Sequence, residues 1–212
     1  MLSDQQFFNF SRTENPGAST GIAYHDHLDM AGNLLLMYAL TVGYKARRVL
    51  EIGTADGTST LAFLKAASEI GGYVMSIDQQ NCDCAHFLVN QFGFDPLWIF
   101  KRGDSHILLK ELLQEKAEFD LILIDGDHSY QGAKQDIIDS CALLKPDGLL
   151  LIHDCYFARE GDGEGTAKSI LEFLRDSEWQ GIILPFSGNL GMFQRRQLVQ
   201  KQIEDVLRVS GF

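Results

Sequence analysis

Five short apolar runs, spaced along the chain, constrain the fold more than any other feature. They cover residues 49–52, 73–77, 97–100, 121–124 and 149–152. The runs LILI and LLLI show no alternation of apolar and polar residues, which is typical of strands that are covered on both faces. Helix-like stretches separate the runs. This alternation predicts an α/β fold: a Rossmann-like, doubly wound, mostly parallel sheet with right-handed crossovers.

The predicted helices between these strands have recognisable starts and ends. They cover residues 58–69, 82–92, 105–116 and 129–144. Ser105 is the predicted N-cap of the third helix, because serine hydroxyls accept hydrogen bonds from free helix amides. The fourth helix is predicted to stop at Lys145-Pro146-Asp147-Gly148, which is a strong helix-ending signal.

Further elements are predicted at both ends of this unit. A helix over 30–44 precedes the first strand, a glycine-rich stretch at 160–165 and a helix near 166–176 follow the fifth, and an amphipathic helix near 197–208 comes last. Between them, residues 181–186 and 190–195 flank Ser187-Gly188-Asn189, which is a hairpin signal. The two hairpin strands bring the predicted sheet to seven strands, with an antiparallel C-terminal hairpin strand.

Length, charge and cysteine content narrow the class of protein. A chain of 212 residues without a visible linker predicts one domain over 1–212, with a core over 30–212 and a lid or extension over 1–29. The formal charge of -11 argues against a nucleic-acid partner. No apolar run approaches the roughly 20 residues of a membrane span. Four cysteines without a CxxC pair, and no signal-peptide pattern, favour the cytoplasm.

Polar and glycine-rich segments follow the first three strands, where parallel sheets bind ligands. Gly53 and Gly57 let the backbone turn tightly, and the helix that follows offers free amides. Asp78 ends the second strand and is placed to accept hydrogen bonds from ribose hydroxyls. The third strand ends near Gly103-Asp104-Ser105, within reach of an adenine edge. The alternative is structural, with glycines that only serve a turn and an Asp78 that only caps a helix.

The glycine motif departs from the dinucleotide fingerprint G-x-G-x-x-G, because Ala55 occupies the middle glycine position. This departure weakens a nicotinamide interpretation.

The motifs VLEIGTADGTST, Asp78, GDS and FDLILIDGDHSYQGAKQDIIDSCALLKPDGLLLIHD together resemble a class I S-adenosylmethionine-dependent methyltransferase. The resemblance covers roughly residues 30–195 and is greatest to small O-methyltransferase-like proteins with DGDHSY after the fourth strand and HD after the fifth. It implies that Glu51, Gly53, Asp56 and Gly57 line the methionine part of the cofactor. By the same resemblance, Asp78 holds the ribose, and Asp104 with Ser105 holds the adenine. Gln79 departs from the family, which often has an apolar residue there.

Acids and imidazoles gather after the fourth and fifth strands, in Asp125-Gly126-Asp127-His128 and His153-Asp154. Like charges held this close raise one another's pKa unless a cation or a proton intervenes. A divalent metal on Asp125, His153 and Asp154 is one solution, and a proton held within the cluster is the other. Oxygen ligands suit Mg, whereas imidazole favours Mn, Fe or Zn. Adjacent strand residues point to opposite faces, so His153 and Asp154 can both be ligands only if the strand has already bent.

The predicted chemistry is in-line methyl transfer to a hydroxyl oxygen, with Asp125, His128 and Asp154 as catalytic residues. His128 is the best candidate for the general base. Its structural alternative is a position at the start of the helix, with Asp127 as N-cap. The loop from Cys155 to Gly165 has the length and glycine content of a lid.

The sequence thus predicts an S-adenosylmethionine-dependent O-methyltransferase for a small hydroxylated molecule, either a sugar or a natural product. A non-catalytic S-adenosylmethionine-binding protein and a nicotinamide-dependent oxidoreductase are the alternatives. The sequence leaves the oligomeric state open, and the 30–44 helix and the terminal helix are the candidate faces for a homodimer.

Overall fold

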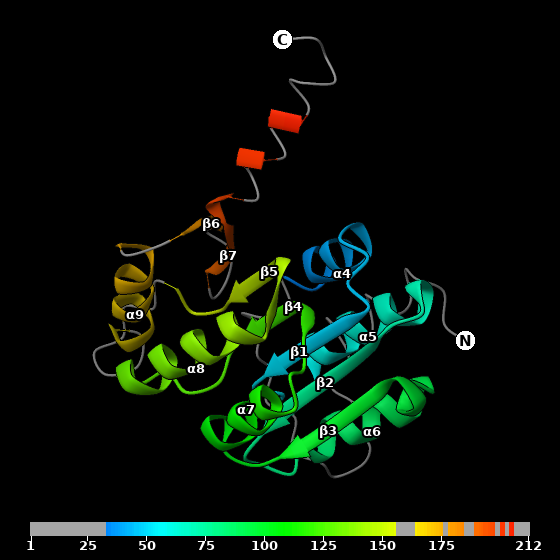
Figure 1. Cartoon of the computed structure of the whole chain (residues 1–212). Coiled ribbons are helices and arrows are strands. Elements are labelled where there is room, and N and C mark those ends of the chain that lie inside the picture. Colours follow the sequence, from blue (N-terminus) through cyan, green and yellow to red (C-terminus); the bar gives the residue numbers. More distant parts are fainter. Residues whose placement is uncertain are drawn as a thin grey trace.

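A seven-stranded sheet forms the centre of the molecule, in the strand order β3-β2-β1-β4-β5-β7-β6 (Figure 1). This computed structural model describes residues 33–155, 164–175, 178–184, 189–197, 200–201 and 204–205. The strands are β1 Arg48–Ile52, β2 Tyr73–Asp78, β3 Trp98–Arg102, β4 Phe119–Ile124, β5 Leu144–Ile152, β6 Trp179–Leu184 and β7 Leu190–Arg195. The first five are parallel, and β7 is antiparallel to both β5 and β6. The predicted fold class is confirmed.

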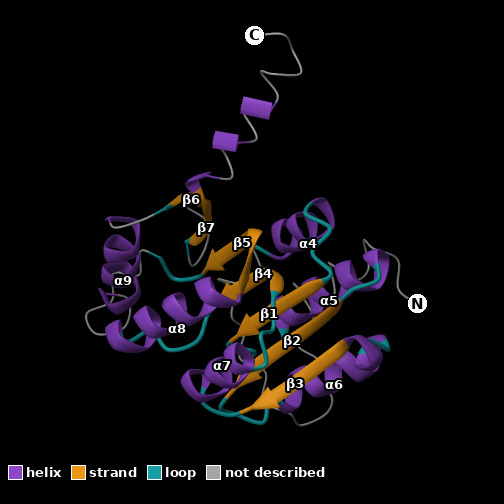
Figure 2. Cartoon of the chain, in the orientation of Figure 1, coloured by secondary structure: helices purple, strands orange, loops and turns teal. Residues whose placement is uncertain are grey.

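Helices cover both faces of the sheet (Figure 2). They are α4 Leu34–Gly43, α5 Thr58–Ile70, α6 Asp83–Phe92, α7 Ser105–Gln114, α8 Tyr130–Leu143 and α9 Glu164–Arg175, with a short 3-10 helix at Asp95–Leu97. Helices α4, α5 and α6 share one hydrophobic core with the sheet, and α7, α8 and α9 share the other. The strands therefore lie between two layers of helices.

Successive strand residues supply the two cores in turn. Val49 and Leu121 belong to the core under α4–α6, whereas Leu50 and Ile122 belong to the core under α7–α9. All four side chains are fully buried. Because both faces are covered, most positions of the central strands carry apolar side chains, and the strand sequences lose their alternation.

The predicted boundary between the fourth helix and the fifth strand is wrong. β5 begins at Leu144 and includes the segment Lys145–Gly148, which the sequence placed in a helix stop. Leu144 pairs with Phe119 of β4, and Lys145 Nζ lies 2.5 Å from Asp120 Oδ1. A register shift in this ladder accommodates the segment with the proline, which lacks an amide donor.

The predicted N-cap of α7 is also wrong by one residue. The carboxylate of Asp104 accepts a 2.8 Å hydrogen bond from the His106 amide, so Asp104 is the cap and Ser105 is the first helical residue. Asp104 has an extended backbone, which is the conformation a capping residue requires.

Several predicted segments lie outside the described residues. They are the N-terminal segment 1–29, most of the Cys155–Gly165 loop and most of the helix near 197–208. Within the described part of the chain, no helix is both long and apolar enough to span a membrane.

Candidate active site

Two cavities lie side by side at the carboxyl ends of the parallel strands. The larger has a volume of about 460 Å³ and the smaller a volume of about 220 Å³. Gly53, Ala55 and Asp125 line both, so they form a shared wall. The larger cavity is also lined by Ile52, Ile77, Asp78, Gln79, Gln80, Gly103, Ser105, Gly126 and Asp127. The smaller is also lined by Thr54, Asp56, Thr58, Ser59, His128, His153 and Asp154.

The shared wall depends on glycine at position 53. Gly53 has a φ of +90°, and a Cβ there would overlap the carbonyl oxygen of Asp125. The Asp125 amide also donates a 2.8 Å hydrogen bond to the carbonyl of Ile52. The segments after β1 and β4 therefore approach each other closely, which only a residue without a side chain permits.

Asp78 holds the glycine-rich loop in place. Its Oδ2 accepts hydrogen bonds from the amides of Thr54 at 2.9 Å and Ala55 at 3.0 Å, and its Oδ1 accepts one from the Gln80 amide at 2.8 Å. A carboxylate has about four lone-pair sites, so roughly one remains for a ligand. The structure thus gives Asp78 a second role, in the loop, that the sequence motif did not reveal.

The predicted adenine residues behave differently from each other. Ser105 lines the larger cavity, together with Gly103 and Gly126, whereas Asp104 is not among its lining residues and caps α7. Ile52, Ile77 and Gln79 also line this cavity, although both isoleucine side chains are almost fully buried in the core.

Glu51 lies beneath the site rather than on its wall. Its side chain is fully buried and lines neither cavity. It accepts 2.6 Å hydrogen bonds from the hydroxyls of Ser59, Thr60 and Ser76. Burial raises the pKa of Glu51 to about 7, although these three hydroxyls act in the opposite direction. Glu51 thus fastens the first turn of α5 to β1 and β2 from below.

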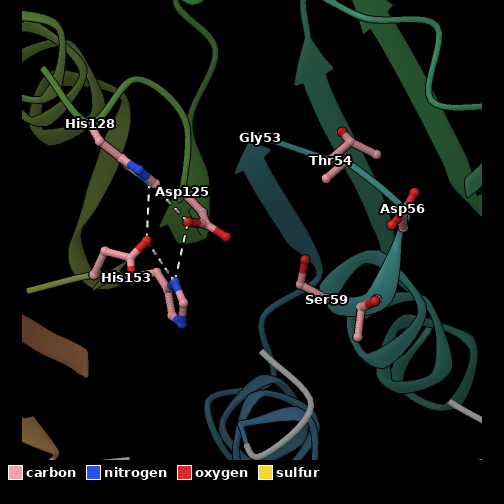
Figure 3. Close-up of a pocket in the computed structure, with 10 residues that line it drawn as sticks. Gly53, Thr54, Asp56, Ser59, Asp125, His128 and His153 are labelled. Atoms are coloured by element: carbon pink, nitrogen blue, oxygen red, sulfur yellow. Dashed lines mark ion pairs between the residues drawn. The ribbon is translucent and has the colours of Figure 1, made fainter. Parts of the chain in front are cut away.

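The smaller cavity has two chemically different walls. Figure 3 shows Thr54, Asp56 and Ser59 on one side, at the start of α5, and Asp125, His128 and His153 on the other. With Asp154, the latter three form what we call the acid–imidazole cluster. The sequence predicted all four of its members, and the structure brings them together.

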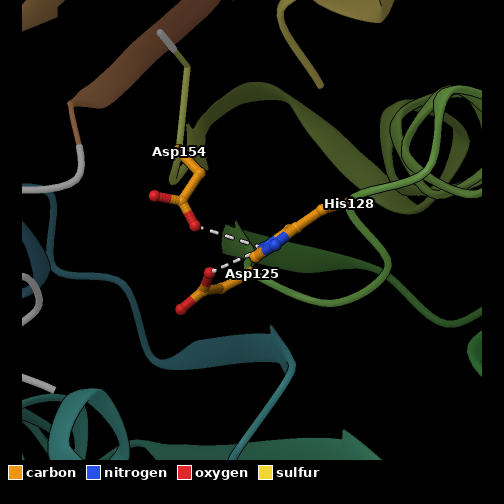
Figure 4. Close-up of side chains that lie close together, drawn as sticks. All are labelled: Asp125, His128 and Asp154. Carbon is orange, nitrogen blue, oxygen red and sulfur yellow. Dashed lines mark ion pairs between the residues drawn. The ribbon is translucent and has the colours of Figure 1, made fainter. Parts of the chain in front are cut away.

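Figure 4 shows Asp125 and Asp154 converging on the imidazole of His128, and Figure 3 shows His153 beside Asp125. His128 Nε2 lies 3.6 Å from Asp125 Oδ1 and 3.2 Å from Asp154 Oδ2. His153 Nδ1 lies 3.3 Å from Asp125 Oδ1 and 3.5 Å from Asp154 Oδ2. Despite these short distances, His128 Nε2, both ring nitrogens of His153 and Asp154 Oδ1 have no hydrogen-bond partner within the described residues.

The backbone at Asp154 makes this convergence geometrically feasible. β5 ends at Ile152, and Asp154 has a φ of +55°, a left-handed conformation that costs a non-glycine residue about 1 kcal/mol or more. This turn breaks the alternation of the strand, so His153 and Asp154 both face Asp125. The chain therefore bends at Asp154, and this bend lets His153 and Asp154 approach Asp125 together.

The charges within the cluster compensate one another. Burial raises the pKa of Asp125, but the two imidazoles outweigh burial and hold it below its usual range. Contact with the Asp125 carboxylate raises the pKa of His128. Burial lowers the pKa of His153, yet the carboxylates of Asp125 and Asp154 outweigh it and raise the net value to about 10. Without a metal, a proton on His153 balances part of the negative charge of the two carboxylates.

A divalent cation fits the same site. One ligand atom each from Asp125, His128 and Asp154 lie within 4.8 Å of one another, and these donors are two oxygens and a nitrogen. His153, the imidazole that the sequence assigned to the metal, has its Nδ1 in the same cluster. An ion with two positive charges would take the place of the proton charge on His153 and give the unpartnered Nε2 of His128 a partner.

Helix α9 supports the segment that carries His128, and the sequence gave no signal of this. Ser129 caps α8 by accepting a 3.1 Å hydrogen bond from the Gly132 amide. A Cβ on Gly165 of α9 would overlap the carbonyl oxygen of His128. Ser169 donates a 3.0 Å hydrogen bond to the carbonyl of Tyr130. These contacts join residues far apart in the chain, so no local pattern predicts them.

Comparison with known proteins adds a family to this geometry. A protein-family model described as a methyltransferase domain matches residues 50–155, which is half of the chain. The chain belongs to this methyltransferase-domain family. The matched segment begins in β1 and ends at Cys155, so it contains both the glycine-rich loop and the acid–imidazole cluster. The predicted resemblance to methyltransferases is confirmed at the level of this domain.

One curated relative of the methyltransferase domain is the O-methyltransferase hkm8 of Aspergillus hancockii. It is 28% identical over 128 residues, which are 59% of this chain and 48% of that protein. The chain thus matches about half the length of this relative.

Solved structures confirm the fold of the methyltransferase domain. The O-methyltransferase TomG of Streptomyces achromogenes, in complex with SAM, is 16% identical, with a TM-score of 0.73 and coverage of 92% of each chain. An O-methyltransferase of Bacillus cereus in complex with SAH is 19% identical, with a TM-score of 0.71 and coverage of 91% of each chain.

Proposed function

We propose that this chain transfers the methyl group of S-adenosylmethionine to a hydroxyl oxygen of a small molecule. The observation that carries the proposal is the shared wall of Gly53, Ala55 and Asp125. It joins a cavity suited to a nucleoside to a cavity that contains acids and imidazoles. The family match, the O-methyltransferase relative and the SAM- and SAH-bound neighbours support the same activity.

The larger cavity is the proposed nucleoside site. Asp78 accepts a hydrogen bond from the ribose with the lone-pair site that the loop amides leave free. Ser105 contacts the adenine, and the loop at Gly53 and Asp56 contacts the methionine part. Gly57 and Glu51 support that loop, Gly57 through its left-handed turn at the start of α5 and Glu51 from below.

The acid–imidazole cluster is the proposed site of reaction. S-adenosylmethionine supplies an electrophilic methyl carbon, and the acceptor oxygen forms a bond to it as the carbon–sulfur bond breaks. Before this, the acceptor hydroxyl must lose its proton. His128 has a partly exposed side chain at the cavity, so it accepts that proton. Asp125 and Asp154 hold the imidazole in place.

We propose that a divalent metal occupies the cluster in the active enzyme, bound by Asp125, Asp154 and an imidazole. Such an ion would lower the pKa of a bound hydroxyl. The mixed donor set favours Mn, Fe or Zn over Mg. With His128 as the third ligand, such an ion would supply the activation of the acceptor hydroxyl in place of His128. With His153 as the third ligand, His128 remains the base.

Calorimetric titration tests the nucleoside site. We expect S-adenosylhomocysteine to bind and NAD not to bind, and Asp78→Ala to weaken the binding of S-adenosylhomocysteine. NAD binding of equal or greater strength would contradict the proposal and favour an oxidoreductase. The absence of a third loop glycine already disfavours that alternative.

Activity measurements separate an enzyme from a protein that only binds the cofactor. We expect Asp125→Ala to abolish methyl transfer while S-adenosylhomocysteine affinity stays within about threefold, because the carboxylate faces the reacting atoms. A variant that remains fully active on the acceptor would show that the cluster has another role. A wild-type protein that binds the cofactor but methylates no hydroxylated sugar or natural product would favour the non-catalytic alternative.

The remaining expectations are also proposals. We propose that the chain belongs to the group with the DGDHSY and HD motifs and forms a single domain with a lid over 1–29. We also propose a lid at Cys155–Gly165 and a cytoplasmic location. A homodimer is supported by exposed apolar side chains on α4 and β6, namely Leu35 at 64% and Ile182 at 58% exposure. Analytical ultracentrifugation of the wild type and Ile182→Glu tests the dimer, which the variant should weaken.

A further inference from the structure

A buried acid, Asp136 of α8, lies directly behind the wall of the larger cavity. Its side chain is fully buried. Oδ1 accepts a 2.8 Å hydrogen bond from the hydroxyl of Ser105, and Oδ2 has no hydrogen-bond partner within the described residues. Ser105 and Gly126 both line the cavity, and a Cβ on Gly126 would lie 3.4 Å from Oδ2. Asp136 therefore lies close to the wall at two points.

The direction of this hydrogen bond determines what Ser105 offers to a ligand. An ionised carboxylate only accepts hydrogen bonds, and a serine hydroxyl has a single hydrogen to donate. The hydroxyl hydrogen of Ser105 is committed to Asp136. The oxygen of Ser105 therefore has only lone pairs left for the cavity.

Burial keeps water away from the carboxylate of Asp136. It also raises the pKa of Asp136 to about 6, with Asp127 and Asp139 acting in the same direction and Ser105 and His106 in the opposite one. His106 Nε2 lies 3.5 Å from Oδ1. The side chain is thus predominantly a carboxylate above about pH 7, and the hydroxyl keeps its orientation.

We propose that Asp136 is a positioning residue that makes Ser105 a hydrogen-bond acceptor and so selects adenine at the nucleoside site. The 6-amino group of adenine donates to such an oxygen. The 6-oxo group of hypoxanthine would instead face a second acceptor without a hydrogen between them. This inference rests on the proposed function, which places the purine at Ser105.

The test compares S-adenosylhomocysteine with S-inosylhomocysteine, in which a 6-oxo group replaces the 6-amino group and N1 carries a hydrogen. Calorimetry at pH 8 gives the ratio of their dissociation constants. We expect the wild type to prefer the adenine compound by about tenfold or more, the effect of one mismatched hydrogen bond. In Asp136→Ala the hydroxyl turns freely, and the ratio should fall to within about threefold.

Three further variants make the result specific. Asp136→Asn keeps an acceptor oxygen for Ser105 and should keep most of the preference. Asp139→Asn removes a neighbouring buried acid of α8 and should leave the ratio unchanged. Ser105→Ala should lose the preference, and it tests the proposal even if Asp136→Ala does not fold.

The outcomes distinguish this inference from the proposed function. A wild type that binds neither compound contradicts the proposed function. Equal binding of both compounds by the wild type overturns the role of Asp136, while the proposed function stands. The same conclusion follows if folded Asp136→Ala or Ser105→Ala keeps the wild-type ratio of dissociation constants. The role of Asp136 is supported if Asp136→Ala and Ser105→Ala lose the preference for the adenine compound and Asp136→Asn retains it.

Discussion

Replacement of Glu51 by glutamine should stabilise the protein relative to the wild type, and the difference in unfolding free energy should grow in favour of the variant as the pH rises. The pKa of this buried carboxyl is about 7 in the folded protein, against an ordinary value of 4.5. The folded state therefore holds the proton more tightly than the unfolded state. Stability falls as the pH rises from about 4.5 to about 7, by about 3 kcal/mol in total. Glutamine has no such proton and is free of this loss.

Urea unfolding of the wild type and Glu51→Gln at several pH values measures the effect. Between pH 5 and 8 the difference in unfolding free energy should shift by about 2 to 3 kcal/mol in favour of the variant. Other titrating groups are common to both proteins and cancel in the difference. Glu111→Gln, at an exposed position of α7, controls for the loss of one negative charge. A difference that stays constant across this range would refute the assignment of a buried, protonated Glu51.

Three further predictions concern the active site. Gly53→Ala forces a side chain into the Asp125 carbonyl at a positive φ, so it should cost about 2 kcal/mol or more in urea unfolding and abolish S-adenosylhomocysteine binding; normal binding would contradict the close approach. Gly165→Ala should displace His128, so it should lower kcat while it changes the affinity for S-adenosylhomocysteine less. Steady-state kinetics measures kcat, and calorimetry measures the affinity. Chelation should remove activity, and added Mn or Zn should restore it. Elemental analysis should find no bound ion in Asp154→Ala. Full activity of the metal-free protein would exclude the metal.

The sequence predicts the sheet well because the strands are covered on both faces. Runs such as LILI at 121–124 can only be satisfied between two layers of helices, so local composition carries the global arrangement. The start of β5 was missed for the opposite reason. Proline and glycine in Lys145–Gly148 indicate a stop locally, whereas pairing with β4 across the sheet decides the outcome.

Site residues were predictable where the strand ends fix their position. Asp78 ends β2, whereas Asp125 and Asp154 follow β4 and β5, and these strand ends meet at one edge of the sheet. The role of each site residue depends on contacts with residues that are far away in the sequence. The burial of Glu51, the loop amides on Asp78 and the pairing of Asp136 with Ser105 all required the folded chain.

A crystal structure with S-adenosylhomocysteine tests the central claim most directly. We predict that the nucleoside fills the larger cavity with its ribose at Asp78. The sulfur should lie at the shared wall and face Asp125 and His128 in the smaller cavity. Binding elsewhere, or a sulfur directed away from the acid–imidazole cluster, would contradict the account.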